Sequence, residues 1–354
     1  MDVRALTVHG PLDVRCTEVP APRPPGAAGA VIRVTAAGIC GSDLHIYDGH
    51  GFSADTGYCL GHEAVGEVIE TGPEVRRFPV GARVLLPASV GCSACAPCAV
   101  GHVVACDHRR SRDGALCYGL SNRLPGSQAE AVGVPDADVN LVEVPDAISD
   151  EAAVLLTDNA PTAWYGCRRA RIEPGDTVAV IGLGPVGQIA VRAALLLGAA
   201  RVLVADPVES RCRQAEASGG TRLDPVEPAK HLRELTRGEG ADAVIEAVGS
   251  DAAIGLAVRV ARQAGRISVL GVTHNDEFPY PMAKAQAREL EFAIGLCSVQ
   301  RELPALLRLC ATGRLELADL VTHRLDLSEG GRAYAMLAAR DPGVGKILLD
   351  PVAS

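Results

Sequence analysis

The hydrophobic and polar positions of this chain follow one pattern up to about residue 155 and another pattern after it. In the first part, short apolar runs are separated by glycine and proline. Such runs lie at residues 30–34, 66–69 and 82–86. Runs of this length between turn residues predict β-strands. A helix is predicted over residues 150–170, because Ser149 is a suitable N-cap and two acidic residues follow it.

From about residue 175, apolar runs alternate with segments of helical character. The predicted strands lie at residues 177–181, 202–205, 243–246 and 267–270. Between the first two a helix is predicted, with Pro185 in its first turn and Gly198 at its C-terminal stop. This alternation predicts an α/β fold in which helices cover a parallel sheet. A helix over residues 301–313 and a strand over residues 345–349 are predicted to follow.

Length, charge and cysteine content narrow the class of protein. The 354 residues agree with about two domains. The net charge is −9 and basic residues are dispersed, so no nucleic-acid partner is expected. No apolar stretch approaches the ~18 residues of a membrane span, and the N-terminus lacks a signal-peptide core, so no membrane association is expected. Twelve cysteines without an export signal favour a reducing cytoplasm and metal binding over disulfides.

Four cysteines lie close together in a segment that we call the cysteine lobe. They are Cys92, Cys95, Cys98 and Cys106, with the spacing C-x2-C-x2-C-x7-C. Four thiolates can surround one tetrahedral Zn²⁺ and leave no open position, so the predicted site is structural rather than catalytic. The alternative, two disulfides in a secreted loop, is disfavoured because nothing else in the chain is typical of secretion.

A glycine-rich turn follows the first strand of the second pattern. It consists of Gly182, Leu183, Gly184, Pro185, Val186 and Gly187. The first glycine permits the tight turn, the second lets backbone approach a pyrophosphate, and the third lets helix and strand pack closely. Asp206 ends the next strand, where its carboxylate can bind the adenosine ribose and repel a 2′-phosphate. The turn therefore predicts NAD rather than NADP, the alternative being a Rossmann-like fold that holds another nucleotide or none.

Four further residues are predicted to contact the dinucleotide. Arg211 could flank the adenine or ribose, which leaves some NADP use conceivable. Gly249 and Val272 follow strands, where the nicotinamide rests in a doubly wound sheet. Lys346 is predicted to reach the pyrophosphate. The alternatives are ordinary packing for the two strand-end residues and a solvated surface position for Lys346.

A second metal site, with an open position, is predicted from residues outside the cysteine lobe. Cys40, His62 and Glu63 supply a thiolate, an imidazole and a carboxylate, and Asp158 is the candidate third ligand. A thiolate and an imidazole with one further carboxylate or thiolate leave a fourth tetrahedral position for water or substrate.

Several motifs together resemble one family. Gly61-His-Glu-x2-Gly66-x5-Gly72-x2-Val75 matches the signature of zinc-containing alcohol dehydrogenases of the medium-chain dehydrogenase/reductase superfamily. The Cys-Gly-Ser-Asp-x-His segment, the cysteine lobe and GLGPVG match the same family in the same order, and the likeness covers essentially the whole chain. Residues 156–164 and 277–281 resemble the bacterial formaldehyde-dehydrogenase-like or alcohol-dehydrogenase-like branch.

The resemblance implies a domain plan and an oligomeric state. A GroES-like β-rich catalytic domain is expected over residues 1–155, which residues 297–354 complete, and a Rossmann domain over residues 156–296. A homotetramer is expected in preference to a dimer.

The resemblance also implies roles for the metal-site residues. Cys40 and His62 would bind a catalytic zinc, and Asp43 would hydrogen-bond the metal-bound histidine. Glu63 can bind the metal directly or lie close to it without coordinating it. Asp158 falls where many members have cysteine. Which of these two carboxylates is the resting ligand stays open.

The implied reaction is hydride transfer between an alcohol and NAD. Zinc would lower the pKa of the alcohol oxygen. Ser42 would hydrogen-bond that oxygen, and the relay would pass through ribose hydroxyls to His45, whose ordinary pKa is near neutral. The alternatives are a turn residue for Ser42 and a surface histidine for His45.

The substrate is expected to be a medium-sized primary alcohol. Polyol, threonine or thiol-adduct formaldehyde dehydrogenation are alternatives within the same class. A non-catalytic nucleotide-binding protein is the alternative from another class. The intact set of zinc-site and relay residues disfavours this last reading.

Overall fold

The computed structural model describes residues 2–109, 116–273, 277–278, 280–341 and 343–351. Spatial contacts divide the chain into two compact units. Unit 1 comprises the residues up to Pro161 together with those from Cys297 onward, and unit 2 comprises Thr162–Leu296. The first boundary lies inside the helix α5 (Asn159–Arg169), later in the chain than the 155/156 boundary expected from the sequence. No loop marks this boundary, because one continuous helix crosses it.

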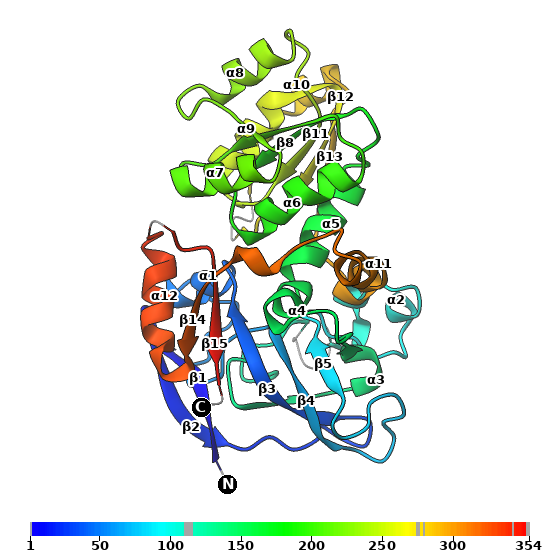
Figure 1. The fold of residues 1–354 in the computed structure, drawn as a ribbon, viewed down its shortest axis with the longest axis vertical. Helices are drawn as coiled ribbons and strands as arrows, with labels where there is room; N and C mark the ends of the chain where they lie inside the picture. The colour runs from blue at the N-terminus through cyan, green and yellow to red at the C-terminus, as the bar shows by residue number, and fades with distance from the viewer. Residues whose placement is uncertain (1, 110–115, 274–276, 279, 342, 352–354) are drawn as a thin grey trace. The chain divides into compact units, whose positions relative to one another are not determined.

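The main sheet of unit 1 combines strands from both ends of the chain. Its strand order is β14-β15-β3-β4-β5-β7, and β6 also pairs with β3. The bounds are β3 (Ala30–Ile39), β4 (Ala64–Thr71), β5 (Arg83–Leu86), β6 (Ala131–Val134), β7 (Val142–Glu143), β14 (Val321–Asp326) and β15 (Lys346–Asp350). Strand β15, red in Figure 1, lies beside the blue β3 and pairs with it antiparallel. The C-terminal segment therefore completes the sheet begun by the N-terminal part.

A hairpin and several helices surround this sheet. The hairpin pairs β1 (Asp2–Gly10) with β2 (Asp13–Pro20) in antiparallel register. The helices are α1 (Asp43–Tyr47), α2 (Ala96–Ala99), α3 (Ala137–Asn140), α4 (Asp150–Leu156), α11 (Val299–Ala311) and α12 (Gly330–Ala338). The predicted N-cap is confirmed, because Ser149 Oγ accepts a hydrogen bond from Ala152 N. Short 3-10 turns lie at Val103–Ala105, Ala318–Leu320 and Leu327–Glu329.

The core of unit 1 lies between the main sheet, the hairpin and α12. Leu6, Ile32, Leu86, Tyr334 and Leu349 are all fully buried there. Burial of such side chains contributes about 1.5–3 kcal/mol each, so the hairpin and the C-terminal segment are held by apolar packing.

Unit 2 is a parallel sheet with the order β10-β9-β8-β11-β12-β13. The bounds are β8 (Thr177–Ile181), β9 (Arg201–Ala205), β10 (Thr221–Arg222), β11 (Ala241–Glu246), β12 (Ala261–Val269) and β13 (Glu291–Ile294). The order reverses between β8 and β11, which is where a doubly wound sheet binds ligands outside the carboxyl ends of its strands.

Helices cover this parallel sheet, as the sequence pattern predicted. Apart from α5, they are α6 (Pro185–Leu196), α7 (Glu209–Ala217), α8 (Pro228–Leu235), α9 (Asp251–Val260) and α10 (Met282–Ala287). Gly198 follows α6 with a φ of +101°, a conformation that favours glycine, which confirms the predicted stop. The helices bury apolar side chains such as Ile254 against Val244 and Ile267 of the sheet.

Some elements were not predicted from the sequence, and others have shifted ends. The β1–β2 hairpin, β13 and α12 were not predicted. Strand β1 buries four consecutive residues, 5–8, instead of alternating ones, β2 and β13 are mostly exposed or half-exposed, and α12 begins with two glycines, which disfavour a helix. Helix α11 begins at Val299 rather than at residue 301. Among the described residues, no helix combines the length and apolar character needed to cross a membrane.

Candidate metal centres and cofactor turn

The four cysteines of the lobe converge on one point. Their sulfur atoms all lie within 4.8 Å of one another, and Cys95 Sγ is 3.9 Å from Cys106 Sγ. Zn–S bonds of about 2.3 Å in a tetrahedron place sulfur atoms roughly 3.8 Å apart, so the lobe fits zinc. All twelve cysteines of the chain lie among the described residues and none forms a disulfide. The two-disulfide alternative is therefore wrong.

The protonation of the lobe also favours a cation. A hydrogen bond from the Cys98 backbone lowers the pKa of the Cys95 thiol to about 6, so a thiolate is available at neutral pH. Burial raises the pKa of Cys98 to about 12 and raises that of Cys106. Several thiolates can coexist in this space only when a cation balances their charge.

Two amide side chains, one buried and one half-buried, hold the lobe against the rest of unit 1. Asn140 Nδ2 donates to Gly91 O at 2.9 Å and to Pro135 O at 2.8 Å, while Asn140 Oδ1 accepts from Gly91 N at 2.9 Å. Gln300 of α11 donates through Nε2 to Ser89 O at 2.6 Å. These residues fix the chain just before Cys92, and sequence reasoning missed them because nothing in their spacing marks them.

The second group of metal-ligating side chains is assembled from three separate segments. Cys40 follows β3, His62 and Glu63 precede β4, and Asp158 lies between α4 and α5. One donor atom from each lies within 4.8 Å of the others, and we call this group the open cluster. Asp158 Oδ2 is 3.6 Å from Cys40 Sγ and 3.8 Å from His62 Nε2. These distances are close to the roughly 3.3–3.8 Å between ligand atoms of a tetrahedral zinc site, so the donor set fits zinc.

A buried carboxylate orients the imidazole of His62. Asp43 is fully buried, and its Oδ1 lies 3.3 Å from His62 Nδ1. Asp43 Oδ2 accepts hydrogen bonds from Cys40 N at 2.9 Å and from Gln128 Nε2 at 3.3 Å. With Nδ1 turned to Asp43, His62 presents Nε2 to the other donors of the open cluster.

Glu63 has a different environment, which corrects one prediction. Its carboxylate forms an ion pair with Lys346 Nζ and accepts a hydrogen bond from Asn159 Nδ2 at 2.8 Å. Lys346 Nζ also donates to Ile39 O at 3.1 Å, and its side chain is 0% exposed. The prediction that Lys346 reaches a pyrophosphate is therefore wrong, because the buried carboxylate of Glu63 draws its ammonium into unit 1. Sequence reasoning also missed Asn159.

The two predicted relay residues lie on the turn after Cys40, and one of them reaches the open cluster. Ser42 Oγ is 3.3 Å from His62 Nε2. His45 is half-buried in α1, and its backbone N donates to Ser42 O at 3.2 Å. The short turn after Cys40 thus brings a hydroxyl to the metal-facing nitrogen and places an imidazole one helical turn away.

The glycine-rich turn of unit 2 has the geometry of a phosphate-binding turn. Gly182 has a φ of +87°, and a Cβ on Gly187 would lie 1.8 Å from Gly182 O. A Cβ on Gly184 would meet no atom within 4 Å, so the backbone there is accessible. Asp206 accepts hydrogen bonds from Leu183 N at 2.7 Å and Val208 N at 2.8 Å. The carboxylate is therefore held beside the turn. Helix α6 begins directly after Gly184, with Pro185 and Val186 as its first residues.

The remaining predicted cofactor residues lie near the carboxyl ends of the strands or on the following helix. A Cβ on Gly249, whose φ is +84°, would lie 2.2 Å from Val272 O, so the turns after β11 and β12 touch. Glu246, fully buried, accepts through Oε1 from Val248 N and Gly249 N at 2.8 and 2.9 Å. Arg211 lies in α7, where its carbonyl accepts from Gln188 Nε2 at 2.7 Å.

Comparison with known proteins identifies the family. The protein-family model described as "Alcohol dehydrogenase GroES-like domain" matches residues 26–146. A second family model, described as "Zinc-binding dehydrogenase", matches residues 185–312. A probable zinc-binding alcohol dehydrogenase of Mycobacterium tuberculosis is 40% identical over 96% of this chain and 86% of its own. The chain belongs to the zinc-containing alcohol dehydrogenase family. The predicted family and the GroES-like and Rossmann fold class are thereby confirmed.

Two further relatives extend this result along the chain. An alcohol dehydrogenase of Cupriavidus necator is 32% identical over 92% of this chain and 93% of its own. The solved structure of the alcohol dehydrogenase from Thermus sp. ATN1 superimposes with a TM-score of 0.91, at 36% identity, over 98% of this chain and 99% of that one. The likeness to zinc-type alcohol dehydrogenases thus extends over nearly the whole chain.

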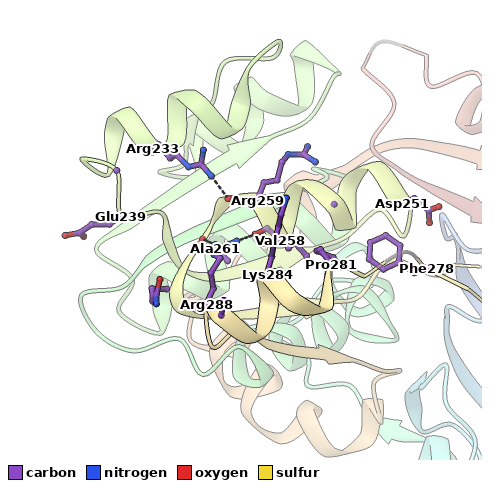
Figure 2. A pocket seen from close by; sticks show the side chains of 14 residues that line it. Arg233, Glu239, Asp251, Val258, Arg259, Ala261, Phe278, Pro281, Lys284 and Arg288 are labelled. Carbon is purple, nitrogen blue, oxygen red and sulfur yellow. Dashed lines mark hydrogen bonds between the residues drawn. The ribbon is translucent and has the colours of Figure 1, made fainter.

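Unit 2 also has a cavity of about 960 Å³ between α8, α9 and α10. Figure 2 shows that Arg233 and Arg288 point toward the C-terminal end of α9. Arg288 donates to Val258 O at 2.8 Å and Arg233 to Arg259 O at 3.3 Å. The cavity contains none of the predicted cofactor residues, and these two arginines cap helix carbonyls, so it is not the candidate functional site.

Proposed function

We propose that this zinc-dependent oxidoreductase transfers hydride between an alcohol and NAD. The observation that carries the proposal is the open cluster, in which Asp158 Oδ2 lies within 3.8 Å of both Cys40 Sγ and His62 Nε2. Mixed sulfur, nitrogen and oxygen donors with one open position are typical of catalytic zinc. We also propose a structural zinc in the cysteine lobe, which makes two zinc ions per chain.

A bound zinc supplies Lewis acidity that lowers the pKa of an alcohol hydroxyl, and a bound nicotinamide accepts the hydride. In this proposal Ser42 Oγ hydrogen-bonds the substrate hydroxyl and takes part in removing its proton. His45, one turn along α1, delivers that proton toward solvent. Asp43 keeps the imidazole of His62 oriented, and its buried charge favours the tautomer with the proton on Nδ1.

The preference for NAD over NADP rests on Asp206. Both of its carboxylate oxygens accept backbone hydrogen bonds, so its position beside the turn is fixed. A fixed negative charge there suits a ribose diol and repels a 2′-phosphate. We further propose that Gly249 and Val272 support the nicotinamide and that Arg211 flanks the adenosine.

The remaining proposals concern substrate and assembly. Small residues precede the cysteine lobe at Ala88 and Ser89, which favours medium-sized primary alcohols over strict formaldehyde specificity. We propose that unit 1 is the catalytic domain and unit 2 the NAD-binding domain, in a cytoplasmic homotetramer. Light scattering on the purified protein tests the tetramer.

The decisive experiment measures zinc content together with NAD⁺ and NADP⁺ reduction on a panel of alcohols, for wild type and Cys40→Ser. Cys297→Ser is the control, because Cys297 belongs to neither group of metal-ligating side chains. We expect about two zinc ions per wild-type chain, about one in Cys40→Ser, and loss of NADH formation in that variant only. One zinc in both proteins with no NADH formed would favour a non-catalytic protein. Turnover of formaldehyde only with a thiol, or of polyols only, would redirect the substrate proposal.

A further inference from the structure

The open cluster contains two carboxylates, whereas an open zinc site needs three protein ligands. Cys40 and His62 supply two of them, so Glu63 and Asp158 compete for the third place. Their surroundings differ. The side chain of Asp158 is 20% exposed, and its Oδ2 already lies 3.6–3.8 Å from the sulfur and the nitrogen donors.

Glu63 is held from two sides. Its Oε1 accepts the hydrogen bond from Asn159 Nδ2, and its Oε2 is paired with the ammonium of Lys346. Glu63, Asn159 and Lys346 are all at most 1% exposed. Water cannot replace either partner without entering the core, so both contacts bind the carboxylate more firmly than they would at the surface.

Asn159 lies where the two carboxylates meet. Its Nδ2 is 2.8 Å from Glu63 Oε1, 3.4 Å from Asp158 Oδ2 and 3.9 Å from Cys40 Sγ. An amide N–H₂ donates two hydrogen bonds and cannot bind a metal through nitrogen. Through this nitrogen, which cannot be a metal ligand, one side chain touches both candidate ligands.

We propose that Asn159 is a positioning residue that, with Lys346, keeps Glu63 from coordinating the metal and so makes Asp158 the third protein ligand. This inference rests on the proposed catalytic metal site. A move of Glu63 Oε1 to the metal would break its bond to Asn159. A move of the whole carboxylate would also leave the buried ammonium of Lys346 with only the carbonyl of Ile39, which is strongly unfavourable. In the proposed arrangement the charges of Cys40 and Asp158 balance a divalent ion, and Glu63 balances Lys346.

The test replaces the metal of the open cluster with Co²⁺ while the cysteine lobe keeps zinc, and records the visible absorption spectrum. Four-coordinate Co²⁺ absorbs much more strongly than five-coordinate Co²⁺, so the spectrum reports the number of ligands. The informative signal is the part that disappears in Cys40→Ser. The variant is Asn159→Leu, which keeps the side-chain volume and removes the amide donor, with Asn159→Ala as a second form if the first does not fold.

We expect wild type to give the intense four-coordinate spectrum. Asn159→Leu is expected to lose a large part of that intensity, because the released Glu63 adds a ligand. Adding Glu63→Gln to Asn159→Leu is expected to restore the intensity, since an uncharged amide is a poor metal ligand. Thr157→Val is the matched control. It removes a buried hydroxyl that donates to Val154 O, and its spectrum should equal that of wild type.

Three outcomes would overturn the inference. An unchanged spectrum in both Asn159 variants would show that Asn159 does not restrain Glu63. A changed spectrum that Glu63→Gln does not restore would mean that the substitution acts through the general structure. An already weak wild-type spectrum that Glu63→Gln strengthens would make Glu63 a resting ligand. Failure of the proposed function is distinguishable, because wild type would then bind no Co²⁺ that depends on Cys40.

Discussion

The cysteine lobe and the open cluster each gather four metal-ligating side chains within 4.8 Å, but they do so in different ways. The lobe takes four identical donors from one continuous segment, residues 92–106. The open cluster takes three kinds of donor from three segments that are far apart in the sequence, from residue 40 to residue 158. A closed site can therefore be encoded locally, whereas the open one depends on how β3, β4 and α4 meet in the fold.

The surroundings of the two sites differ as well. Neutral amides fasten the chain beside the lobe, as Asn140 does to Gly91. Buried charges surround the open cluster, namely Asp43 beside His62 and Lys346 beside Glu63. Neutral hydrogen bonds are sufficient to hold a closed site rigid. A site that must exchange a ligand also needs partners for those buried charged groups that do not bind the metal.

The largest effect is expected from stepwise removal of metal. Dialysis against a chelator should remove the metal of the open cluster first, because that site has an accessible position and the lobe has none. Alcohol-dependent kcat/KM should fall about a thousandfold, since Lewis acidity contributes several kcal/mol to the transition state. Zinc analysis, activity and circular dichroism on the same samples check this. Unfolding before activity is lost would mean that the lobe loses its metal first.

Lys346→Met is expected to destabilise the protein by roughly 3–5 kcal/mol, because it leaves Glu63 buried without its partner charge. Urea denaturation at neutral pH measures this loss. Burial raises the pKa of Glu63, so the carboxyl of the variant takes up a proton as the pH falls. The deficit relative to wild type should therefore shrink at lower pH.

The matched control for this prediction is the double variant Lys346→Met/Glu63→Gln. It removes both charges and should recover most of the lost stability. A deficit in Lys346→Met that does not change with pH would argue that lost packing, rather than the unpaired charge, causes it.

Asn140→Leu tests the neutral fastening of the lobe. It leaves the backbone groups of Gly91 and the carbonyl of Pro135 without their partner, and unsatisfied buried groups cost about 1–3 kcal/mol each. We expect a loss of roughly 3 kcal/mol, again by urea denaturation, together with faster release of the lobe's zinc to a chelator. Retention of the open cluster's Co²⁺ spectrum would show that the two sites are held independently. Loss of both metals would show that they are not.

Ser149→Ala is expected to have the smallest effect on stability and serves as a reference for the other variants. Ser149 caps α4 and belongs to neither metal-ligating group. Loss of an N-cap costs about 1 kcal/mol. The thermal midpoint should fall by a few degrees with zinc content and kcat unchanged. A fall in kcat would show that α4 transmits strain to Asp158, which follows it.

Much of this fold could be predicted from sequence because its signals are local. The strand at Thr177–Ile181 agrees with the predicted range, and Pro185 begins the helix after the glycine-rich turn as expected. The hairpin β1–β2 was not predicted, because β1 buries four consecutive residues, 5–8, instead of alternating ones, and β2 is mostly half-exposed. Neither strand therefore shows a two-residue period, and β2 is held by contacts with β1 and α12.

The sequence by itself identified the side chains that meet in both candidate metal centres and the glycine-rich turn, since residue type and spacing carry that chemistry. The tertiary structure decided which charges balance each other. Lys346 was expected at a phosphate and lies instead beside Glu63, because a buried carboxylate attracts the nearest cation whatever its distance along the chain. The place of Asn159 was also decided by the tertiary structure. Its neighbours Glu63 and Cys40 are remote in sequence, and only the folded sheet brings them within hydrogen-bonding distance.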